Sequence, residues 1–145
     1  MTTYQVVDWV DQQHVYGCGI AALAMINRRS YNQVRDWFLE RGRDIEANRG
    51  GTMFDWDLYL VKHGFTVARE FRYIFGKLQE PWPPAPFGTI HLCEVRPNQT
   101  QAHLVVMLDT GEVLDPAKRG VFTLGDYPMV ESVAACERCW MITDL

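Results

Sequence analysis

The sequence predicts an α+β domain in which helices come first and an antiparallel sheet follows. In the first half of the chain, apolar residues recur at helical spacing over 17–27, 31–41 and 53–63. From Phe65 onward they alternate, or form short runs separated by turn residues, as strands do. Helices and strands that are segregated along the chain are typical of the α+β class.

The composition bounds the kind of protein. A chain of 145 residues, 48% hydrophobic and 22% charged, has the size and content of one folded domain, so we predict a single domain over 1–145. A net charge of −4 without a basic block argues against a nucleic-acid partner. No apolar run can span a bilayer and no signal-peptide pattern occurs, so we expect no membrane partner and a cytoplasmic location. The oligomeric state stays open.

The three helices have recognisable ends. The segment 17–27 is apolar on nearly every side, which indicates a helix that passes through the core. Ser30 and Thr52 have the side chains of N-caps, and Gly42 and Gly64 are expected to end the helices that follow them.

The second half of the chain predicts the sheet. Strands are expected over 65–71, 89–95, 103–108, 112–114 and 140–143. Between the first two we expect a helical turn over 75–78 and a stiff extended segment over 81–86, which is rich in proline. Cys136 and Cys139 are expected to flank a surface turn before the last strand, because a single C-x-x-C pair is a weak zinc signal.

Cys18 is the candidate nucleophile. It lies between Gly17 and Gly19, where the buried helix begins, and a helix N-terminus beside an imidazolium stabilises a thiolate. The two glycines are expected to leave room for a substrate carbonyl and to keep backbone N–H groups accessible. Taken alone, Cys18 also fits a buried structural cysteine.

Three polar residues favour the catalytic interpretation. Gln12 lies in the loop before the helix, where its amide can donate to an oxyanion beside the Cys18 N–H; Gln13 takes this role if the loop is shifted by one residue. His103 begins an apolar strand and suits a general base. Asp115 ends the next strand and can orient the imidazole. The competing histidines are His14, His63 and His91, of which His91 fits a core or supporting position better.

The turn between the two strands decides whether Asp115 can face His103. A two-residue turn would place Asp115 opposite Val106, on the face away from His103. A three-residue loop over 109–111, with Gly111 left-handed, places Asp115 opposite Val105, which shares a face with His103. We therefore predict the three-residue loop.

The residues also resemble a known family. The segment 12–26 looks like the active-site helix of papain-like cysteine peptidases, and most of all that of the double-glycine leader peptidases of bacteriocin exporters and their stand-alone relatives. The segments 102–107 and 113–117 resemble that family's histidine strand and Asp-Pro turn. Gly17 stands where the family usually has an aspartate.

The resemblance implies a papain-like fold with Cys18 as nucleophile, His103 as base, Asp115 as orienting residue and Gln12 as oxyanion donor. It implies no metal or cofactor. The expected function is that of a cysteine peptidase, which hydrolyses a peptide or isopeptide bond in a peptide or protein substrate through a thioester on Cys18. Two alternatives stay open: acyl transfer or deamidation on the same fold, and a catalytically silent phage or toxin-system protein that binds a host target.

Overall fold

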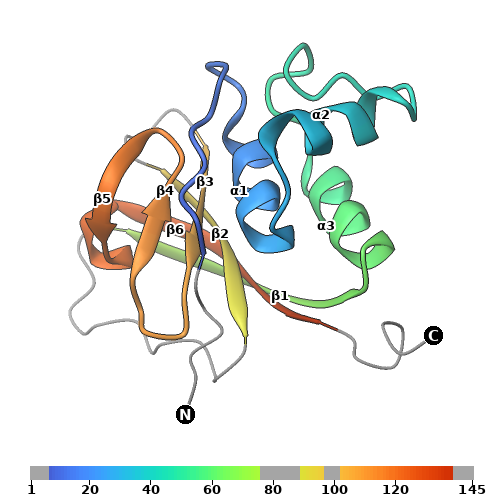
Figure 1. Ribbon diagram of the computed structural model, residues 1–145. Helices are drawn as coiled ribbons and strands as arrows, with labels where there is room; N and C mark the ends of the chain where they lie inside the picture. The colour runs from blue at the N-terminus through green and yellow to red at the C-terminus, as the bar shows by residue number, and fades with distance from the viewer. Residues whose placement is uncertain (1–6, 76–88, 97–101, 139–145) are drawn as a thin grey trace.

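The computed structural model describes residues 7–75, 89–96 and 102–138. Within these ranges the helices are α1 (Cys18–Asn27), α2 (Tyr31–Leu39), α3 (Met53–Lys62) and the short 3-10 helix η1 (Leu124–Asp126). The strands are β1 (Phe65–Phe75), β2 (Ile90–Arg96), β3 (His103–Met107), β4 (Val113–Asp115), β5 (Lys118–Phe122) and β6 (Met129–Arg138). Figure 1 shows α1, α2 and α3 together on one side of the sheet, so the predicted α+β class is confirmed.

Helix α1 forms the centre of the core. Every residue from Gly19 to Asn27 is buried, and the helix packs against β3, α2 and α3. A helix that is apolar all round needs neighbours on all sides, and α1 has the sheet on one side and two helices on the other (Figure 1). The predicted core helix is confirmed.

The other two helices begin with capping boxes. Ser30 Oγ accepts a hydrogen bond from the Gln33 N–H, and the Gln33 side chain accepts one from the Ser30 N–H in return. Thr52 and Asp55 make the same reciprocal pair at the start of α3. Each cap contributes about 1 kcal/mol to helix stability by satisfying backbone donors that have no intrahelical partner. The predicted N-caps are therefore confirmed.

The sheet is antiparallel throughout, in the order β1-β6-β2-β3-β4-β5. Successive side chains of a strand point alternately into two buried clusters, which explains why the strands are apolar on both faces. One cluster faces the helices and includes Leu92, Leu104, Val106, Ala134 and Cys136. The other lies on the opposite face and includes Cys93, Val95, Val105, Met107, Val113, Leu124, Tyr127, Val130 and Val133.

The structure corrects the predicted sheet in several details, and it adds β5, which was not predicted. β6 pairs with both β1 and β2 in the middle of the sheet, at a place where no strand was predicted. Cys136 is completely buried within β6, so its assignment to a surface turn was wrong. Phe75 ends β1 instead of beginning a helical turn. The predicted features at 76–78, 81–86 and 140–143, and Cys139, lie outside the described residues.

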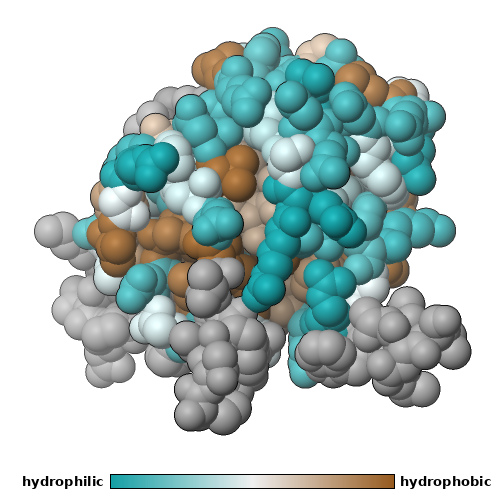
Figure 2. Space-filling view, viewed as in Figure 1, coloured by the Kyte–Doolittle hydropathy of each residue, from teal (hydrophilic) through white to brown (hydrophobic). Residues whose placement is uncertain are grey.

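The face shown in Figure 2 carries both hydrophilic and hydrophobic residues. Hydrophilic residues cover most of the helical side, whereas hydrophobic residues reach the surface beside β4 and β5. Val121 of β5, for example, is 68% exposed. In the part of the chain that the structure describes, no helix has the length and apolar content needed to cross a membrane.

Candidate active site

Cys18 is the first residue of α1, and Gly17 is its N-cap. The Gly17 N–H donates to the His14 carbonyl oxygen at 2.9 Å, which ends the preceding loop in a tight turn. The N–H groups of a first helical turn have no intrahelical partner, so they point their positive dipoles at whatever occupies the space before Cys18. Cys18 is partly exposed, whereas Cys93 and Cys136 are fully buried, and burial raises the pKa of both of those thiols.

The glycines beside Cys18 serve packing beneath the turn. A Cβ atom on Gly17 would lie 2.2 Å from the Tyr31 hydroxyl oxygen, and one on Gly19 would lie 2.9 Å from Trp56 Nε1. The expectation that these glycines leave room for a substrate carbonyl therefore needs correction, because two aromatic side chains fill that space. An aspartate at position 17 would require the Tyr31 hydroxyl to move, because a Cβ atom there lies too close to it.

His103 lies at the start of β3 and contacts both other members of the predicted triad. Its Nε2 is 2.6 Å from Asp115 Oδ1, and Cys18 lies close enough to influence the pKa of the ring. Because Nε2 is engaged by the carboxylate, Nδ1 is the ring nitrogen left to face the thiol. The His103 side chain is 11% exposed and that of Asp115 is 2% exposed, so the pair is shielded from water.

The electrostatics of this group favour an imidazolium. Burial lowers the pKa of His103, but hydrogen bonds to Asp115 and Cys18 and the negative charge on these partners raise it to about 9. Burial raises the pKa of Asp115, but hydrogen bonds from His103, Tyr127 and the Ala117 N–H, with the charge on His103, bring it below its ordinary value. The site thus holds a positive ring between two groups that carry negative charge when ionised.

The β3–β4 hairpin brings Asp115 to His103. Val106 pairs with Leu114, so that Asp115 falls opposite Val105. The Leu108 N–H donates to the Glu112 carbonyl at 2.8 Å, and Gly111 has a φ of 88°. Residues 109–111 therefore form the three-residue loop with a left-handed glycine, and this prediction is confirmed.

Two residues that the sequence interpretation missed hold the turn after β4. The Tyr127 hydroxyl donates to Asp115 Oδ2 at 2.5 Å, so both carboxylate oxygens are occupied. Trp9 Nε1 donates to the Asp115 carbonyl at 2.8 Å. Neither residue follows a recognisable pattern in the sequence, because each reaches Asp115 only through the folding of distant segments.

The predicted site residues line one cavity of about 390 Å³. Its walls include Gln12, Cys18, His103 and Asp115 together with Val15, Tyr16, Arg49, Gly50, Ala102, Ala117 and Lys118. The Gln12 N–H donates to the Pro116 carbonyl at 3.0 Å, which ties this loop to the aspartate turn. Gln13 is exposed and does not line the cavity, so the alternative oxyanion donor is disfavoured.

The Gln12 side chain is held by its own loop. Its Nε2 lies 3.2 Å from the His14 carbonyl oxygen and 3.5 Å from that of Val15, and its Oε1 is buried with no partner among the described residues. Donation to an oxyanion therefore requires the amide to exchange these long bonds for a shorter one to the substrate.

The other histidines take no part in the cavity wall. His91 is buried in β2, where burial lowers its pKa. His63 caps α3, with Nδ1 2.7 Å from the Tyr59 carbonyl oxygen. His14 is exposed, and its Nδ1 accepts from the Tyr16 N–H at 3.0 Å. Across residues 7–75, 89–96 and 102–138, no group of three or more His, Cys, Asp or Glu side chains is placed to hold a metal ion.

Comparison with known proteins defines the fold. No protein-family profile matches the sequence, and no curated protein matches it. The structure is similar to the crystal structure of a double glycine motif protease from an AMS/PCAT transporter, which was solved in complex with the leader peptide. The TM-score is 0.55 with 16% sequence identity, and the match covers 91% of each chain.

The chain therefore has the papain-like α+β peptidase fold that the resemblance implied, with the nucleophile candidate on the buried helix. At this level of identity the likeness concerns the fold, whereas the roles of individual side chains depend on the geometry described above.

Proposed function

We propose that this protein is a cysteine hydrolase that cleaves a peptide or isopeptide bond with Cys18 as nucleophile. The observation that carries the proposal is that Cys18, His103 and Asp115 line one cavity, with His103 hydrogen-bonded to Asp115 and close enough to Cys18 for the thiol to affect its pKa. A thiol, an imidazole and an orienting carboxylate in this order form the arrangement needed for nucleophilic acyl transfer.

In the first half of the reaction, the Cys18 thiolate attacks the substrate carbonyl carbon and forms a C–S bond. The negative charge that develops on the carbonyl oxygen faces the N-terminus of α1, where the Cys18 N–H and the Gln12 amide donate to it. The protonated His103 then transfers its proton to the leaving nitrogen as the C–N bond breaks. The products are an amine and a thioester on Cys18.

In the second half, His103 takes a proton from water, and the resulting hydroxide attacks the thioester carbonyl. The C–S bond breaks, a carboxylic acid leaves, and Cys18 and His103 return to their starting state. Asp115 keeps the ring oriented through both steps and stabilises its positive charge. A peptide as substrate is supported by the similar protease, which was solved with a bound leader peptide.

The direct test is the reactivity of Cys18 at acidic to neutral pH. Iodoacetamide labelling, followed by peptide mass spectrometry, measures the rate at each of the four cysteines in one sample. We expect Cys18 to react faster in the folded protein than in urea-unfolded protein at the same pH, because His103 lies beside it and can accept the thiol proton. His103→Ala should remove this advantage, while Cys18→Ser should abolish labelling at that site alone.

Cleavage is measured next with a peptide library and the same variants. Loss of the general base typically lowers kcat/KM by about 10²- to 10⁴-fold. If Cys18 reacts no faster in the folded protein than in the unfolded one, the proposal is wrong. If Cys18 is reactive and peptides are consumed only when amines are added, the acceptor is an amine, and the hydrolase assignment gives way to acyl transfer.

A further inference from the structure

The cavity around Cys18 is positive, although the chain as a whole carries a net charge of −4. Arg49 and Lys118 both line it. The acidic side chain in the lining is Asp115, whose two oxygens are already bound to His103 and Tyr127. Among the described residues, a ligand in the cavity therefore meets two cations and no available carboxylate.

Arg49 is held at the rim by an unusual stretch of backbone. Its φ is 57°, and Gly50 and Gly51 follow with φ values of 93° and 77°. A left-handed conformation is unfavourable at a residue other than glycine, so the surrounding structure has to stabilise it. The Gly50 N–H donates to the Ile45 carbonyl at 2.9 Å, and Trp56 Nε1 donates to the Gly50 carbonyl at 3.0 Å.

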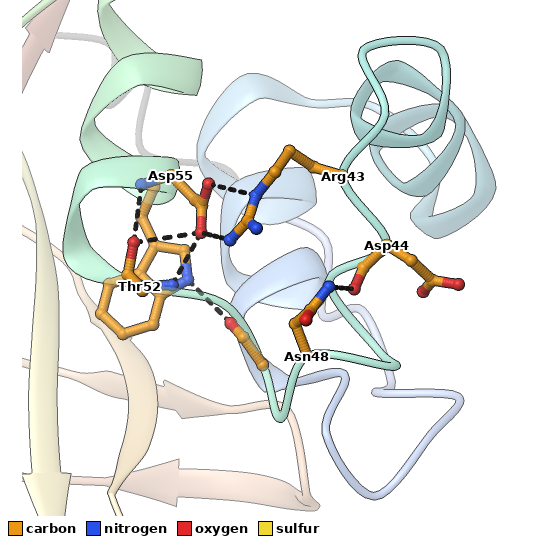
Figure 3. Close-up of polar contacts among 7 residues, drawn as sticks. Arg43, Asp44, Asn48, Thr52 and Asp55 are labelled. Carbon is orange, nitrogen blue, oxygen red and sulfur yellow. Dashed lines mark hydrogen bonds and ion pairs between the residues drawn. The ribbon is translucent and has the colours of Figure 1, made fainter.

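Side chains on both sides of Arg49 brace the same loop. Figure 3 shows Asn48 directed to Asp44, whose backbone carbonyl accepts from the Asn48 amide at 2.7 Å. It also shows Arg43 against Asp55, joined by hydrogen bonds of 3.0 and 2.6 Å. The backbone on both sides of Arg49 is therefore held by hydrogen bonds, and Arg49 itself lines the cavity.

The Arg49 guanidinium has no hydrogen-bond or ion-pair partner among the described residues. Other arginines of the chain are neutralised: Arg43 pairs with Asp55, and Arg69 with Asp57. The charge of Arg49 is therefore available to a ligand.

Lys118 lines the same cavity and belongs to the sheet. It is the first residue of β5 and pairs with Asp115 across the β4–β5 turn. Its Nζ lies 4.6 Å from the centroid of the Phe122 ring, and it makes no ion pair with a described carboxylate. The two cations therefore come from the helical half and from the sheet, and both line the cavity that holds Cys18.

We propose that the substrate is an anionic peptide whose carboxylates are bound by Arg49 and Lys118 beside the scissile bond. This inference rests on the proposed function, which places the scissile carbonyl at Cys18. Arginine binds a carboxylate through two parallel hydrogen bonds, and lysine acts as a mobile point charge. The recognised carboxylate belongs either to an internal Asp or Glu side chain or to a peptide C-terminus.

The first test uses two reagents of nearly equal size that differ in charge. Iodoacetate is an anion and iodoacetamide is neutral, so the ratio of their rates at Cys18 reports the local positive potential. We expect Arg49→Asn and Lys118→Gln each to lower this ratio by about 2- to 5-fold, since exposed charge pairs are weak, and the double variant to lower it further.

The variants are chosen to keep the fold. Asparagine tolerates the left-handed backbone at position 49, and Arg49→Lys restores the charge and should restore most of the ratio. Lys62→Gln removes the same charge from the exposed end of α3 and should leave the ratio unchanged. High salt should shrink the difference between the parent protein and Arg49→Asn, because it screens exposed charges.

The second test measures peptide binding without turnover. Cys18→Ala protein is titrated with fluorescent peptides matched as Glu against Gln, each with a free or an amidated C-terminus. Tighter binding of the Glu peptides means that the cations bind the carboxylates of internal side chains. A requirement for the free C-terminus means that they bind the terminal carboxylate. In both cases Arg49→Asn should weaken peptide binding by about 2- to 5-fold.

Equal affinity for all four peptides, together with a reagent ratio that Arg49→Asn leaves unchanged, overturns the inference. A reactive Cys18 in that case leaves the proposed hydrolase standing. An unreactive Cys18 with selective binding of acidic peptides has the opposite meaning, because the cationic cleft is then real and the catalytic assignment is wrong.

Discussion

Replacing Asp115 by asparagine tests the charge that organises the site. The carboxylate accepts hydrogen bonds from His103 Nε2 at 2.6 Å, the Tyr127 hydroxyl at 2.5 Å and the Ala117 N–H at 2.8 Å. Asparagine preserves the shape but removes the charge, and its NH₂ group cannot accept from any of the three donors. The substitution therefore removes the electrostatic partner of the imidazolium without opening a cavity.

The structure sets the size of the effect. The pKa of His103 is raised to about 9 from an ordinary value of 6.5, a difference worth about 3 kcal/mol between the two protonation states. Burial acts in the opposite direction, so the rise comes from Asp115 and Cys18. Removing one of these two partners should lower the pKa of His103 by at least about one unit, or roughly 1.4 kcal/mol.

The measurement is a pH titration of the histidine Cε1–H resonances by ¹H–¹³C NMR. The chain has four histidines, and His103→Gln identifies the resonance of interest by its disappearance. We expect a midpoint near pH 9 in the parent protein and a lower one in Asp115→Asn. The matched control is Asp8→Asn, which makes the same chemical change at an exposed position.

Two results would refute this account of the site. The first is a parent midpoint at or below the ordinary histidine value of about 6.5. The second is a midpoint that Asp115→Asn does not move although the variant remains folded. If the account holds, the same substitution should also lower kcat/KM for peptide cleavage by about 10²- to 10⁴-fold, because the base loses its orientation and its charge partner.

Three further outcomes follow from the geometry. Tyr127→Phe removes a hydrogen bond to a buried carboxylate and should cost about 1.5–3 kcal/mol of unfolding free energy by urea denaturation; an unchanged midpoint contradicts the bond. Gly17→Ala places a Cβ 2.2 Å from the Tyr31 hydroxyl and should cost about 1–3 kcal/mol, with Tyr31→Phe in the same chain recovering part of the loss. Two groups make the free energy of unfolding depend on pH. The raised pKa of His103 contributes stability that is complete below about pH 6.5 and is lost as the pH rises through about 9. The lowered pKa of Asp115 contributes stability that is present above about pH 4 and is lost on acidification. Urea titrations across this range check both contributions, and His103→Gln should flatten the dependence on the alkaline side.

The helices could be predicted because their signals are local. Ser30 and Thr52 are followed at the right spacing by Gln33 and Asp55, and each capping box forms as those four residues alone dictate. The burial of α1 could also be predicted, since an apolar surface all round has no other stable place in a small domain.

The middle of the sheet could not be predicted in the same way. β6 contains Ala134 and Ala135, which have little strand preference, and it ends with the charged pair Glu137 and Arg138. What makes this segment a strand is its position between β1 and β2, which supply hydrogen-bond partners on both edges. Those pairings join residues far apart in the sequence, so no local sequence pattern predicts them.

In the candidate site, too, some contacts could be predicted from local sequence patterns and others could not. The approach of Asp115 to His103 could be predicted because a short hairpin with a left-handed Gly111 sets the register by itself. Tyr127 and Trp9 could not, because Trp9 lies in the N-terminal segment and Tyr127 follows η1, and neither position carries a local signal that points to Asp115. The space that Gly17 provides is used by Tyr31 of the next helix, a packing relation that the sequence around the glycine does not reveal.

These distant contacts couple the two halves of the proposed chemistry. The Gln12 N–H is bonded to the Pro116 carbonyl, and Trp9 is bonded to the carbonyl of Asp115, so the N-terminal segment and the aspartate turn form one unit. The side chain proposed to stabilise the oxyanion and the carboxylate proposed to orient the base are therefore both tied to one span of backbone, residues 115 and 116. A change that shifts this span should weaken both functions together, which distinguishes a site built as a unit from residues that happen to lie near one another.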